Sequence, residues 1–296
     1  AEELADGQIV ALKTLRRSIA AKSENRRRFI KEGRLLAKLN SPYVTRLIEA
    51  NEDNGVAYLA IEFVDGSSVG GLLKEKWQLD ERLALSIVCD VARALEIAHA
   101  HGIIHRDIKP DNILLSWSGD DLPRARLTDF GLARQIDQTE SMQVTQAGAL
   151  LGTPFYMAPE QWAGGKKVDA RSDIYGLGAT LYRMLAGSPP FEALDIADLM
   201  NSHLKEPPPP LQKHNPAVSD GLVAIIEKSL AKDRDDRYSD AGELLDDFER
   251  LLRGEASSMV LHPQLPDLAD EQRFMTWEFQ WDLESTPRQL WEYVSN

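Results

Sequence analysis

Cysteine is almost absent from this sequence, because Cys89 is the only one in 296 residues. A single thiol cannot form an internal disulfide, which excludes small disulfide-stapled scaffolds and favours a reducing compartment. Residues 84–88 before it are mostly apolar (ALSIV), so we expect a buried structural thiol and not a nucleophile.

Long hydrophobic runs and a surplus of positive charge are also missing. No stretch approaches the roughly 18 uninterrupted apolar residues of a membrane span, and none has the pattern of a signal peptide, so we expect a cytoplasmic protein with no membrane span in this chain. The formal net charge of −13 argues against nucleic acid or an anionic membrane as a partner. The remaining composition, 43% hydrophobic and 27% charged, is typical of an ordinary soluble globular protein.

Strand-like patterns come first along the chain and helical patterns follow. Residues 9–13, 44–49 and 56–64 read as strands, and residues 24–39 carry apolar side chains at helical spacing. Further helices are expected at 68–76, 80–101, 172–186, 195–203, 219–230 and 240–253, with proline runs between some of them. The order predicts an α+β protein with a small strand-rich part and a larger helical part. Residues 255–274 are polar and weakly periodic, which predicts a linker.

Three short motifs carry the chemical information. The segment 104–115 reads IHRDIKPDNILL, Asp129-Phe130-Gly131 follows it, and Ala158-Pro159-Glu160 comes later. In this order and at these separations the motifs resemble the protein kinase family, whose catalytic loop reads H-R-D-x-x-x-x-N and is followed by D-F-G and A-P-E. The resemblance covers about residues 7–253. It implies the two-lobed kinase fold, with an N-terminal lobe over 1–64 and a helical lobe over 65–254.

The resemblance implies the roles of the polar residues in the catalytic loop. Phosphoryl transfer depends on positioning and on neutralising charge on the phosphate oxygens. Asp107 would accept or orient the proton of the attacking hydroxyl, and Lys109 would place a cation near the transferring phosphate. Asn112 and Asp129 would supply hard oxygen ligands suited to Mg²⁺. The Asp-x-Lys spacing resembles the serine/threonine branch of the family.

ATP is the expected co-substrate, and a second set of residues would bind it. Lys13 matches the strand lysine that grips the α- and β-phosphates, and Glu32 matches its partner on the following helix. Taken alone, each is more often a solvated surface charge. The adenine ring would lie between Ala11 and Leu114, and the backbone of the hinge at 62–64 would form hydrogen bonds with the edge of the ring. The residues implied to bind ATP are Lys13, Glu32, Ala11, Glu62, Val64 and Leu114, with Ile61 just before the hinge.

Residues 132–157 correspond to the activation loop. Arg106 precedes Asp107, the arrangement found in kinases that loop phosphorylation controls, because a phosphate can neutralise that arginine and order the loop. Thr145 matches best the position where bacterial kinases phosphorylate themselves, and Thr139 and Ser141 are weaker candidates. An ordinary polar loop residue is the alternative for each. Thr153 is better placed to hydrogen-bond Asp107 and Lys109, and its presence again resembles serine/threonine specificity.

The remaining motif residues are expected to be structural. The resemblance implies that Asp173 caps the backbone of the catalytic loop and that Glu160 forms a buried ion pair with Arg237. We expect His105 to be a packing residue and not a base. It would stack with Phe130, Leu36 and Leu47 in an apolar column between the lobes.

The chain departs from the family pattern at both ends. The Gly-rich loop should lie roughly fifteen to twenty residues before Lys13, but the sequence begins twelve residues before it, and residues 1–8 read as a turn. We expect truncation of the gene model or expressed segment, with the first two strands missing. Residues 275–296 read as a strand, a turn and a helix, and resemble the opening of START-like helix-grip domains, which enclose apolar ligands. A strand and helix that pack on the kinase or are loosely ordered are about as consistent with this segment.

The leading prediction is an ATP- and Mg²⁺-dependent serine/threonine protein kinase of the bacterial type, acting on protein substrates and on its own loop, the latter in a transient homodimer. Two alternatives stay open. A pseudokinase scaffold is the first, and loss of Mg·ATP binding would favour it. A small-molecule phosphotransferase that shares the fold is the second, but Thr153, the segment 158–160 and Arg237 resemble a platform for protein substrates.

Overall fold

A computed structural model describes residues 2–3, 9–15, 17–119, 121–130, 154–162 and 168–255. Within it, Ala1–Leu261 form one compact unit. Four predicted positions, Thr139, Ser141, Thr145 and Thr153, lie outside the described residues, and so does the segment 275–296.

An antiparallel sheet of four strands forms the N-terminal lobe. Its strands are β1 (Glu2–Glu3), β2 (Ile9–Thr14), β3 (Leu47–Asp53) and β4 (Val56–Glu62), in the order β1-β2-β4-β3. Asn54 and Gly55 join β3 to β4 with φ angles of 47° and 79°. Positive φ at two central residues gives the turn the twist that a tight hairpin needs, and Asn-Gly adopts it readily. The register then places Lys13 opposite Leu59 and Ala11 opposite Ile61.

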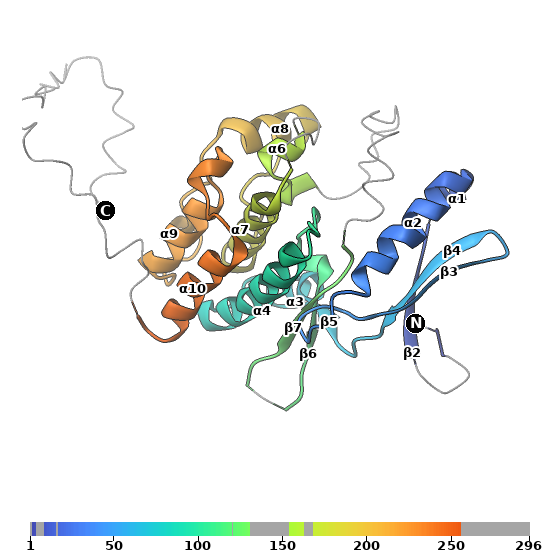
Figure 1. The fold of residues 1–296 in the computed structure, drawn as a ribbon. Helices are drawn as coiled ribbons and strands as arrows, with labels where there is room; N and C mark the ends of the chain where they lie inside the picture. The colour runs from blue at the N-terminus through green and yellow to red at the C-terminus, as the bar shows by residue number, and fades with distance from the viewer. Residues whose placement is uncertain are drawn as a thin grey trace, which may run out of the picture. The chain divides into compact units, whose positions relative to one another are not determined.

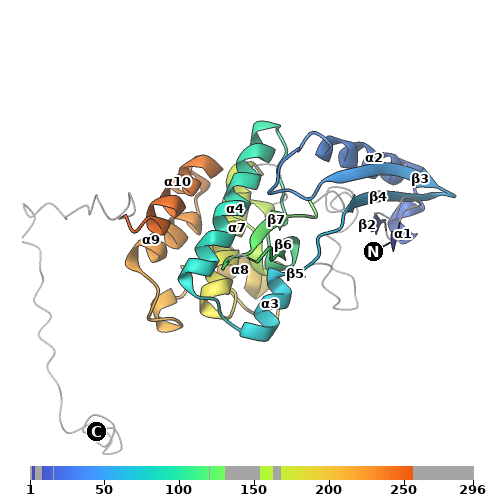
Figure 2. The same ribbon diagram turned by 90° about the horizontal axis from the view of Figure 1, so that it is seen from below.

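Helix α2 (Ser23–Leu36) packs against β3 and β4, and the short helix α1 (Arg17–Ala20) precedes it. Figure 2 shows α2 lying along these strands. Its buried residues are Asn25, Phe29 and Gly33, which recur at four-residue spacing and so share one face. A Cβ at Gly33 would lie 2.4 Å from the side chain of Leu59, so a glycine lets the helix approach the sheet closely.

The rest of the described chain is mainly helical. Its helices are α3 (Val69–Lys76), α4 (Glu81–Ala100), α6 (Pro159–Trp162), α7 (Ala170–Ala186), α8 (Ile196–Lys205), α9 (Asp220–Ser229) and α10 (Ala241–Leu252). Six of them begin after a Ser or Asp whose side chain accepts a backbone N–H of the first turn. Figure 1 shows α4 and α7 lying between α10 and the strands β6 and β7.

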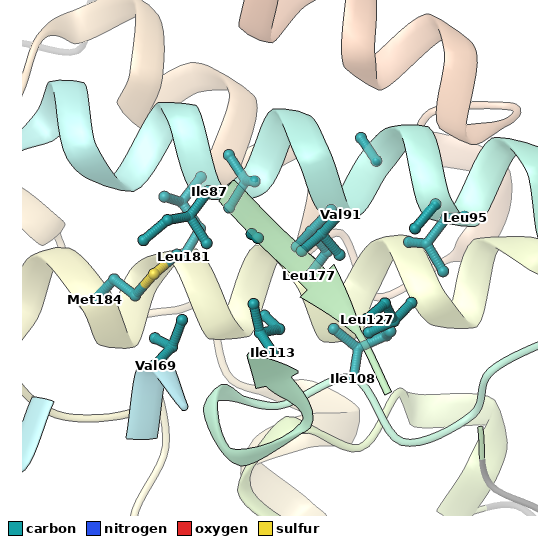
Figure 3. Packing of buried hydrophobic residues seen from close by; sticks show 14 of the residues in the cluster. Val69, Ile87, Val91, Leu95, Ile108, Ile113, Leu127, Leu177, Leu181 and Met184 are labelled. Carbon is teal, nitrogen blue, oxygen red and sulfur yellow. The ribbon is translucent and has the colours of Figure 1, made fainter. Parts of the chain in front are cut away.

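Buried aliphatic side chains from α4 and α7 form the centre of this lobe. Figure 3 shows Ile87, Val91 and Leu95 of α4 meeting Leu177 and Leu181 of α7. All five are fully buried. Burying a large aliphatic side chain contributes about 1.5–3 kcal/mol to the stability of the folded state, so this cluster stabilises the helical lobe. Figure 3 also shows that Ile108, Ile113 and Leu127, which flank the polar motifs, pack into the same cluster.

A small second sheet lies between the two lobes. It consists of β5 (Ser67–Ser68), β6 (Ile113–Ser116) and β7 (Arg124–Leu127) in that order. The segment before β3 joins it, because Leu127 N donates to Tyr43 O at 2.8 Å and Thr45 N donates to Leu127 O at 3.0 Å. Val44 and Leu127 thus form a parallel bridge that connects the N-terminal lobe to β7.

Most predicted elements lie within a few residues of the observed ones, and the α+β arrangement of two lobes is confirmed. One detail is wrong: residues 1–8 do not form only a turn, since Glu2 and Glu3 pair with Val10 and Ile9 as β1. Strands β5, β6 and β7 have two to four residues each, too few to show a period in the sequence. In the part of the chain that the structure describes, no helix is long and apolar enough to cross a membrane.

Candidate active site

The β6–β7 hairpin brings two separate motifs together. Asn112 precedes β6 and Asp129 follows β7 by two residues. Ile113 pairs with Leu127, and Thr128 N donates to Asn112 O at 3.0 Å. Because antiparallel partners at the open end of a hairpin lie side by side, these two oxygen-bearing side chains come from adjacent backbone positions. The hairpin therefore places the two predicted metal ligands close together along the backbone.

Asp107 is the centre of a compact polar group. Lys109 Nζ lies 3.0 Å from Asp107 Oδ2, and Asn112 Nδ2 donates to Asp107 O at 2.7 Å and to Asp107 Oδ2 at 3.1 Å. Lys109 and Asp107 keep 17% and 16% of their side chains exposed. The carboxylate is thus held by two neighbours and still reaches solvent, which an acceptor for a substrate proton requires.

Lys13 reaches this site from β2 and forms a salt bridge with Asp129 Oδ1 at 3.0 Å. The expected contact was with Glu32 instead, and between these described residues no Lys13–Glu32 salt bridge is present. Asp129 itself has φ of 60°, a left-handed backbone that is uncommon outside glycine. This conformation sets the direction of the carboxylate, which Lys13 meets.

Glu32 is half-buried on α2. Burial raises the pKa of its carboxyl group, whereas the charges of Arg28, Arg106 and Lys31 act in the opposite direction. Arg106 belongs to the catalytic loop, so Glu32 interacts electrostatically with that loop as well as with its own helix.

His105 lies in the core and contacts Phe130. Their ring centroids are 4.6 Å apart, and His105 Nε2 lies 2.9 Å from Thr128 O. Burial lowers the pKa of His105, so the ring stays neutral. Phe130, Leu36 and Leu47 line one small cavity together with Lys13 and Asp129. The packing interpretation of His105 agrees with these contacts.

Asp173 fixes the backbone of the catalytic loop from α7. Its Oδ2 accepts His105 N at 2.8 Å and its Oδ1 accepts Arg106 N at 2.7 Å. Arg106 has φ of 67°, so the loop makes a strained turn there that the two hydrogen bonds stabilise. His99 Nε2 lies 2.8 Å from Asp173 Oδ2. The sequence did not single out His99, although it stands on α4 facing the start of the loop.

Gln161 also supports the loop, and the sequence analysis missed it. Its Nε2 donates to Arg106 O at 2.9 Å, and its Oε1 accepts Ala158 N at 2.9 Å. The side chain is buried and links the catalytic loop to the segment before α6. The only sequence signal is its place directly after Ala158-Pro159-Glu160.

Glu160 and Arg237 form the predicted buried ion pair. Arg237 Nη1 and Nη2 donate to Glu160 Oε1 and Oε2 at 2.9 and 3.0 Å, a two-pronged contact with 0% and 10% side-chain exposure. Burial alone would raise the pKa of Glu160, but the hydrogen bonds and charge of Arg237 together with the Ser172 hydroxyl lower it. The pair joins α6 to the segment before α10.

The residues expected around an adenine ring lie where the two lobes meet. Ala11 and Leu114 are partly exposed, on β2 and β6, and Val64 is buried after β4. Glu62 has an additional role, since its Oε1 pairs with Arg126 Nη1 at 2.6 Å and its Oε2 accepts Arg46 N at 3.3 Å. Its side chain therefore connects the end of β4 to β7, and its backbone N–H donates to Arg46 O at 2.9 Å.

The donor set suits a hard divalent cation and the phosphates that it would bridge. Asn112 uses its Nδ2 for Asp107, which leaves its amide oxygen as the acceptor at the end of β6. Asp129 adds a half-exposed carboxylate, and Lys13 adds a cation beside it. Carboxylate and amide oxygens are preferred ligands of such ions. The residues present therefore fit a nucleotide with its divalent metal.

Comparisons with known proteins agree with this geometry. Residues 1–248 match the model of the protein kinase domain. The chain is 38% identical over 251 residues to the serine/threonine-protein kinase PknB of Mycolicibacterium smegmatis, an alignment that covers 83% of this chain and 39% of the relative. It is also 38% identical over 247 residues to the serine/threonine-protein kinase pkn2 of Myxococcus xanthus, covering 83% of this chain and 29% of that protein.

A solved structure is similar as well. The kinase domain of PknI from Mycobacterium tuberculosis superimposes with a TM-score of 0.63 at 31% identity, covering 81% of this chain and 85% of that domain. The chain spans about two-fifths or less of the length of the two curated relatives named above.

Proposed function

Because the chain belongs to the protein kinase domain family, we propose that its cleft transfers the γ-phosphate of ATP to serine and threonine hydroxyls of protein substrates. One observation carries this proposal: Asp107, Lys109 and Asn112 form one hydrogen-bonded group, and Asp129 with Lys13 stands beside it across the end of the β6–β7 hairpin. Family membership implies ATP and a divalent metal. We propose that the metal is Mg²⁺, which prefers the oxygen ligands that Asn112 and Asp129 offer.

Each polar residue then has a distinct part in the reaction. Asp107 orients the substrate hydroxyl and accepts its proton, and Lys109 keeps that carboxylate in place through the 3.0 Å contact. ATP with its metal supplies the phosphoryl group and neutralises charge on the phosphate oxygens. Asn112 contributes twice, since its amide nitrogen holds Asp107 and its amide oxygen would be a ligand of the metal. Such positioning accounts for most of the catalysis in phosphoryl transfer.

We assign nucleotide binding to the facing lobe. Lys13 holds the phosphates, and Glu32 takes the place of Asp129 beside Lys13 when the nucleotide is bound. Ala11 and Leu114 enclose the adenine ring, and backbone groups of residues 62–64 hydrogen-bond its edge. The partial exposure of Ala11 and Leu114 supports this assignment. The Glu62–Arg126 salt bridge supports it too, because it fixes the end of β4, where the adenine edge would bind.

We also propose that phosphorylation of the loop, with Thr145 as the first candidate, regulates the site through Arg106, and that Thr153 orients Asp107 and Lys109. The support is the position of Arg106, whose backbone is held by Asp173 and Gln161 directly beside Asp107. Autophosphorylation in a transient homodimer stays a prediction. The linker at 255–274, an apolar ligand for the segment 275–296 and a reducing compartment also stay predictions.

The test uses the natural protein with Mg·ATP, followed by intact mass measurement and mapping of phosphorylated residues. Asp107→Asn should lower the rate of phosphate incorporation by about 10²–10⁴-fold, because the proton acceptor is lost. Asp129→Asn should abolish it by removing a metal ligand. Asp246→Asn, which removes an exposed charge on α10, is the matched control and should leave the rate unchanged.

Three outcomes would contradict the proposal. Equal incorporation by Asp107→Asn and the unmutated protein would remove Asp107 from the reaction. Absence of both ATP binding and phosphate incorporation would favour the scaffold alternative, and phosphate on a small molecule alone would favour the small-molecule phosphotransferase.

A further inference from the structure

Trp77 has a backbone conformation that is unusual for a residue with a side chain. It directly follows α3 with φ of 60° and ψ of −52°, and Gln78 N donates to Lys76 O at 2.6 Å across it. This arrangement is a γ-turn of the rare and strained kind. A glycine would adopt positive φ without steric strain. A tryptophan at this position therefore lowers the stability of the turn relative to glycine.

The contacts of Trp77 fix its position but bury little of it. Arg183 Nη1 donates to Trp77 O at 3.1 Å, and the guanidinium carbon of Arg183 lies 5.4 Å from the centre of the indole ring. Gly187 lies so close that a Cβ there would clash with Trp77 Nε1. Leu79 N donates to Met184 O at 2.8 Å and holds the turn against α7. Even so, Trp77 is 64% exposed, so the turn presents a fixed aromatic ring to solvent.

Packing alone does not account for a strained and exposed tryptophan. Hydrophobic stabilisation is proportional to the apolar area removed from water, and this ring keeps most of its area in water. Backbone strain of this kind is concentrated at binding and functional sites. Tryptophan and arginine are also the side chains that most often dominate the energy of a protein interface, and a rigid ring loses little entropy on binding. Trp77 and Arg183 together thus have the properties of a binding anchor.

Arg183 connects this anchor with the candidate active site. Tyr156 lines a small hollow together with Asp107 and Ile108. Burial raises the pKa of the Tyr156 hydroxyl to about 12, whereas the charge of Arg183 acts in the opposite direction, so the guanidinium lies near this hydroxyl. Because Arg183 also contacts Trp77, a continuous surface runs from Asp107 over Tyr156 and Arg183 to Trp77.

The charges along this surface are mixed. Asp111 and Glu192, both exposed, act on Tyr156 in the direction opposite to Arg183. Charge alone therefore does not define what binds here, and the exposed ring of Trp77 does. A second cation would be repelled from a ring that already contacts the Arg183 guanidinium. An aliphatic or aromatic side chain meets no such repulsion and would remove the ring from water.

We propose that Trp77 binds an apolar side chain of the protein substrate, at a fixed separation in sequence from the serine or threonine that is phosphorylated. This inference rests on the proposed function and adds a specificity-determining residue to it. Trp77 lies beyond Arg183 on the surface that starts at Asp107, so it holds the substrate and the transition state equally well. The preference should therefore appear in KM and not in kcat.

The test uses the full chain with Mg·ATP and a set of peptides in which one serine is surrounded by alanine and a single leucine is moved from position to position. One placement of the leucine should lower KM by at least about fivefold relative to the peptide without leucine. In Trp77→Ala the two peptides should have equal KM. Trp117→Ala removes another exposed tryptophan, which follows β6, and should keep the preference.

Trp77→Gly separates binding from folding, because glycine relieves the strain of the turn while the ring is lost. This variant should unfold at a urea concentration close to that of the unmutated protein and should lose the preference for leucine. A large decrease in the urea midpoint of Trp77→Gly would show that the ring serves the fold, which would overturn the proposal.

Anisotropy of the same peptides labelled with fluorescein measures binding without phosphoryl transfer. Binding of a leucine peptide through Trp77 with no phosphate incorporation would contradict the proposed function and leave the peptide site. Phosphorylation with no preference for any placement of the leucine, or a preference that Trp77→Ala keeps, would overturn the inference and leave the proposed function. Neither incorporation nor binding would overturn both. Self-association that Trp77→Ala abolishes would also overturn the inference, because a second copy of the chain would then cover the ring.

Discussion

Replacing Arg237 with methionine tests the energetics of the buried ion pair most directly. Besides its two contacts with Glu160, the Arg237 guanidinium donates to Ala231 O at 2.8 Å, to Arg171 O at 3.1 Å and to Lys232 O at 3.3 Å. Methionine keeps much of the apolar stem but removes all of these donors. The Glu160 carboxylate would then be left in the interior with the Ser172 hydroxyl as its remaining side-chain partner.

The expected cost is large because the group left behind is charged. Removing one partner of a buried pair typically destabilises a protein by about 3–5 kcal/mol. A domain of this kind has about 5–15 kcal/mol in total, so the variant should fold but unfold easily. A more exposed ion pair serves as the comparison. Arg234 and Asp169 lie 2.9 Å apart, with side chains 33% and 42% exposed. Arg234→Met should therefore lower the free energy of unfolding by at most about 1 kcal/mol.

The pH dependence adds a second criterion. In the unmutated protein the folded-state pKa of Glu160 lies below its ordinary value, so the pair stabilises the fold above about pH 4.3 and loses this effect as the pH falls through the lowered pKa. Without Arg237, burial dominates and raises the folded-state pKa of Glu160. The variant should therefore gain relative stability as the pH falls from 7 toward 5, and the difference between the two proteins should shrink.

Urea unfolding followed by tryptophan fluorescence at both pH values measures these differences. A double variant, Glu160→Gln/Arg237→Met, should be more stable than Arg237→Met alone because no charge remains buried. A loss below about 1 kcal/mol for Arg237→Met, or a loss independent of pH, would refute the reasoning.

Three further predictions concern other buried groups. Asp173→Ala leaves the N–H groups of His105 and Arg106 without their acceptor, so unfolding by urea should show a loss of about 1–3 kcal/mol for each, and activity should fall with it. Cys89 is 1% exposed and burial raises its thiol pKa to about 12, so a thiol reagent at pH 8 should react at least about a hundredfold faster in denaturant than in the folded protein. Burial lowers the pKa of Lys232 to about 8, so stability should rise with pH between about 8 and 10, and urea titrations of Lys232→Met should lack this slope.

Much of the fold could be predicted from the sequence, because long elements repeat their pattern often enough to be recognised. The helix expected over 80–101 is observed as Glu81–Ala100, and that over 240–253 as Ala241–Leu252. Short strands cannot be found this way. Strand β5 has two residues, and only its pairing with β6 defines it.

The contacts of the candidate site also fall into those that a local motif predicts and those that only the tertiary structure shows. Asp107, Lys109 and Asn112 lie within six residues of one another, so a local motif predicts their proximity, and the structure brings them together. Gln161 contacts the catalytic loop from α6, and His99 on α4 contacts Asp173, which holds that loop; only tertiary packing places them there. The salt bridge of Lys13 with Asp129 could not be predicted for a related reason, since a sequence motif does not specify which of two nearby carboxylates a lysine contacts.

The bridge between Val44 and Leu127 has a mechanical consequence. It is reinforced by the 3.0 Å contact between the hydroxyls of Thr45 and Thr128, so the two lobes are connected by a short seam next to Asp129. A rigid body that rotates about an axis moves least close to that axis. If the N-terminal sheet turned on this seam, Asp129 would lie near the pivot and move least, whereas the far ends of β3 and β4 would move furthest.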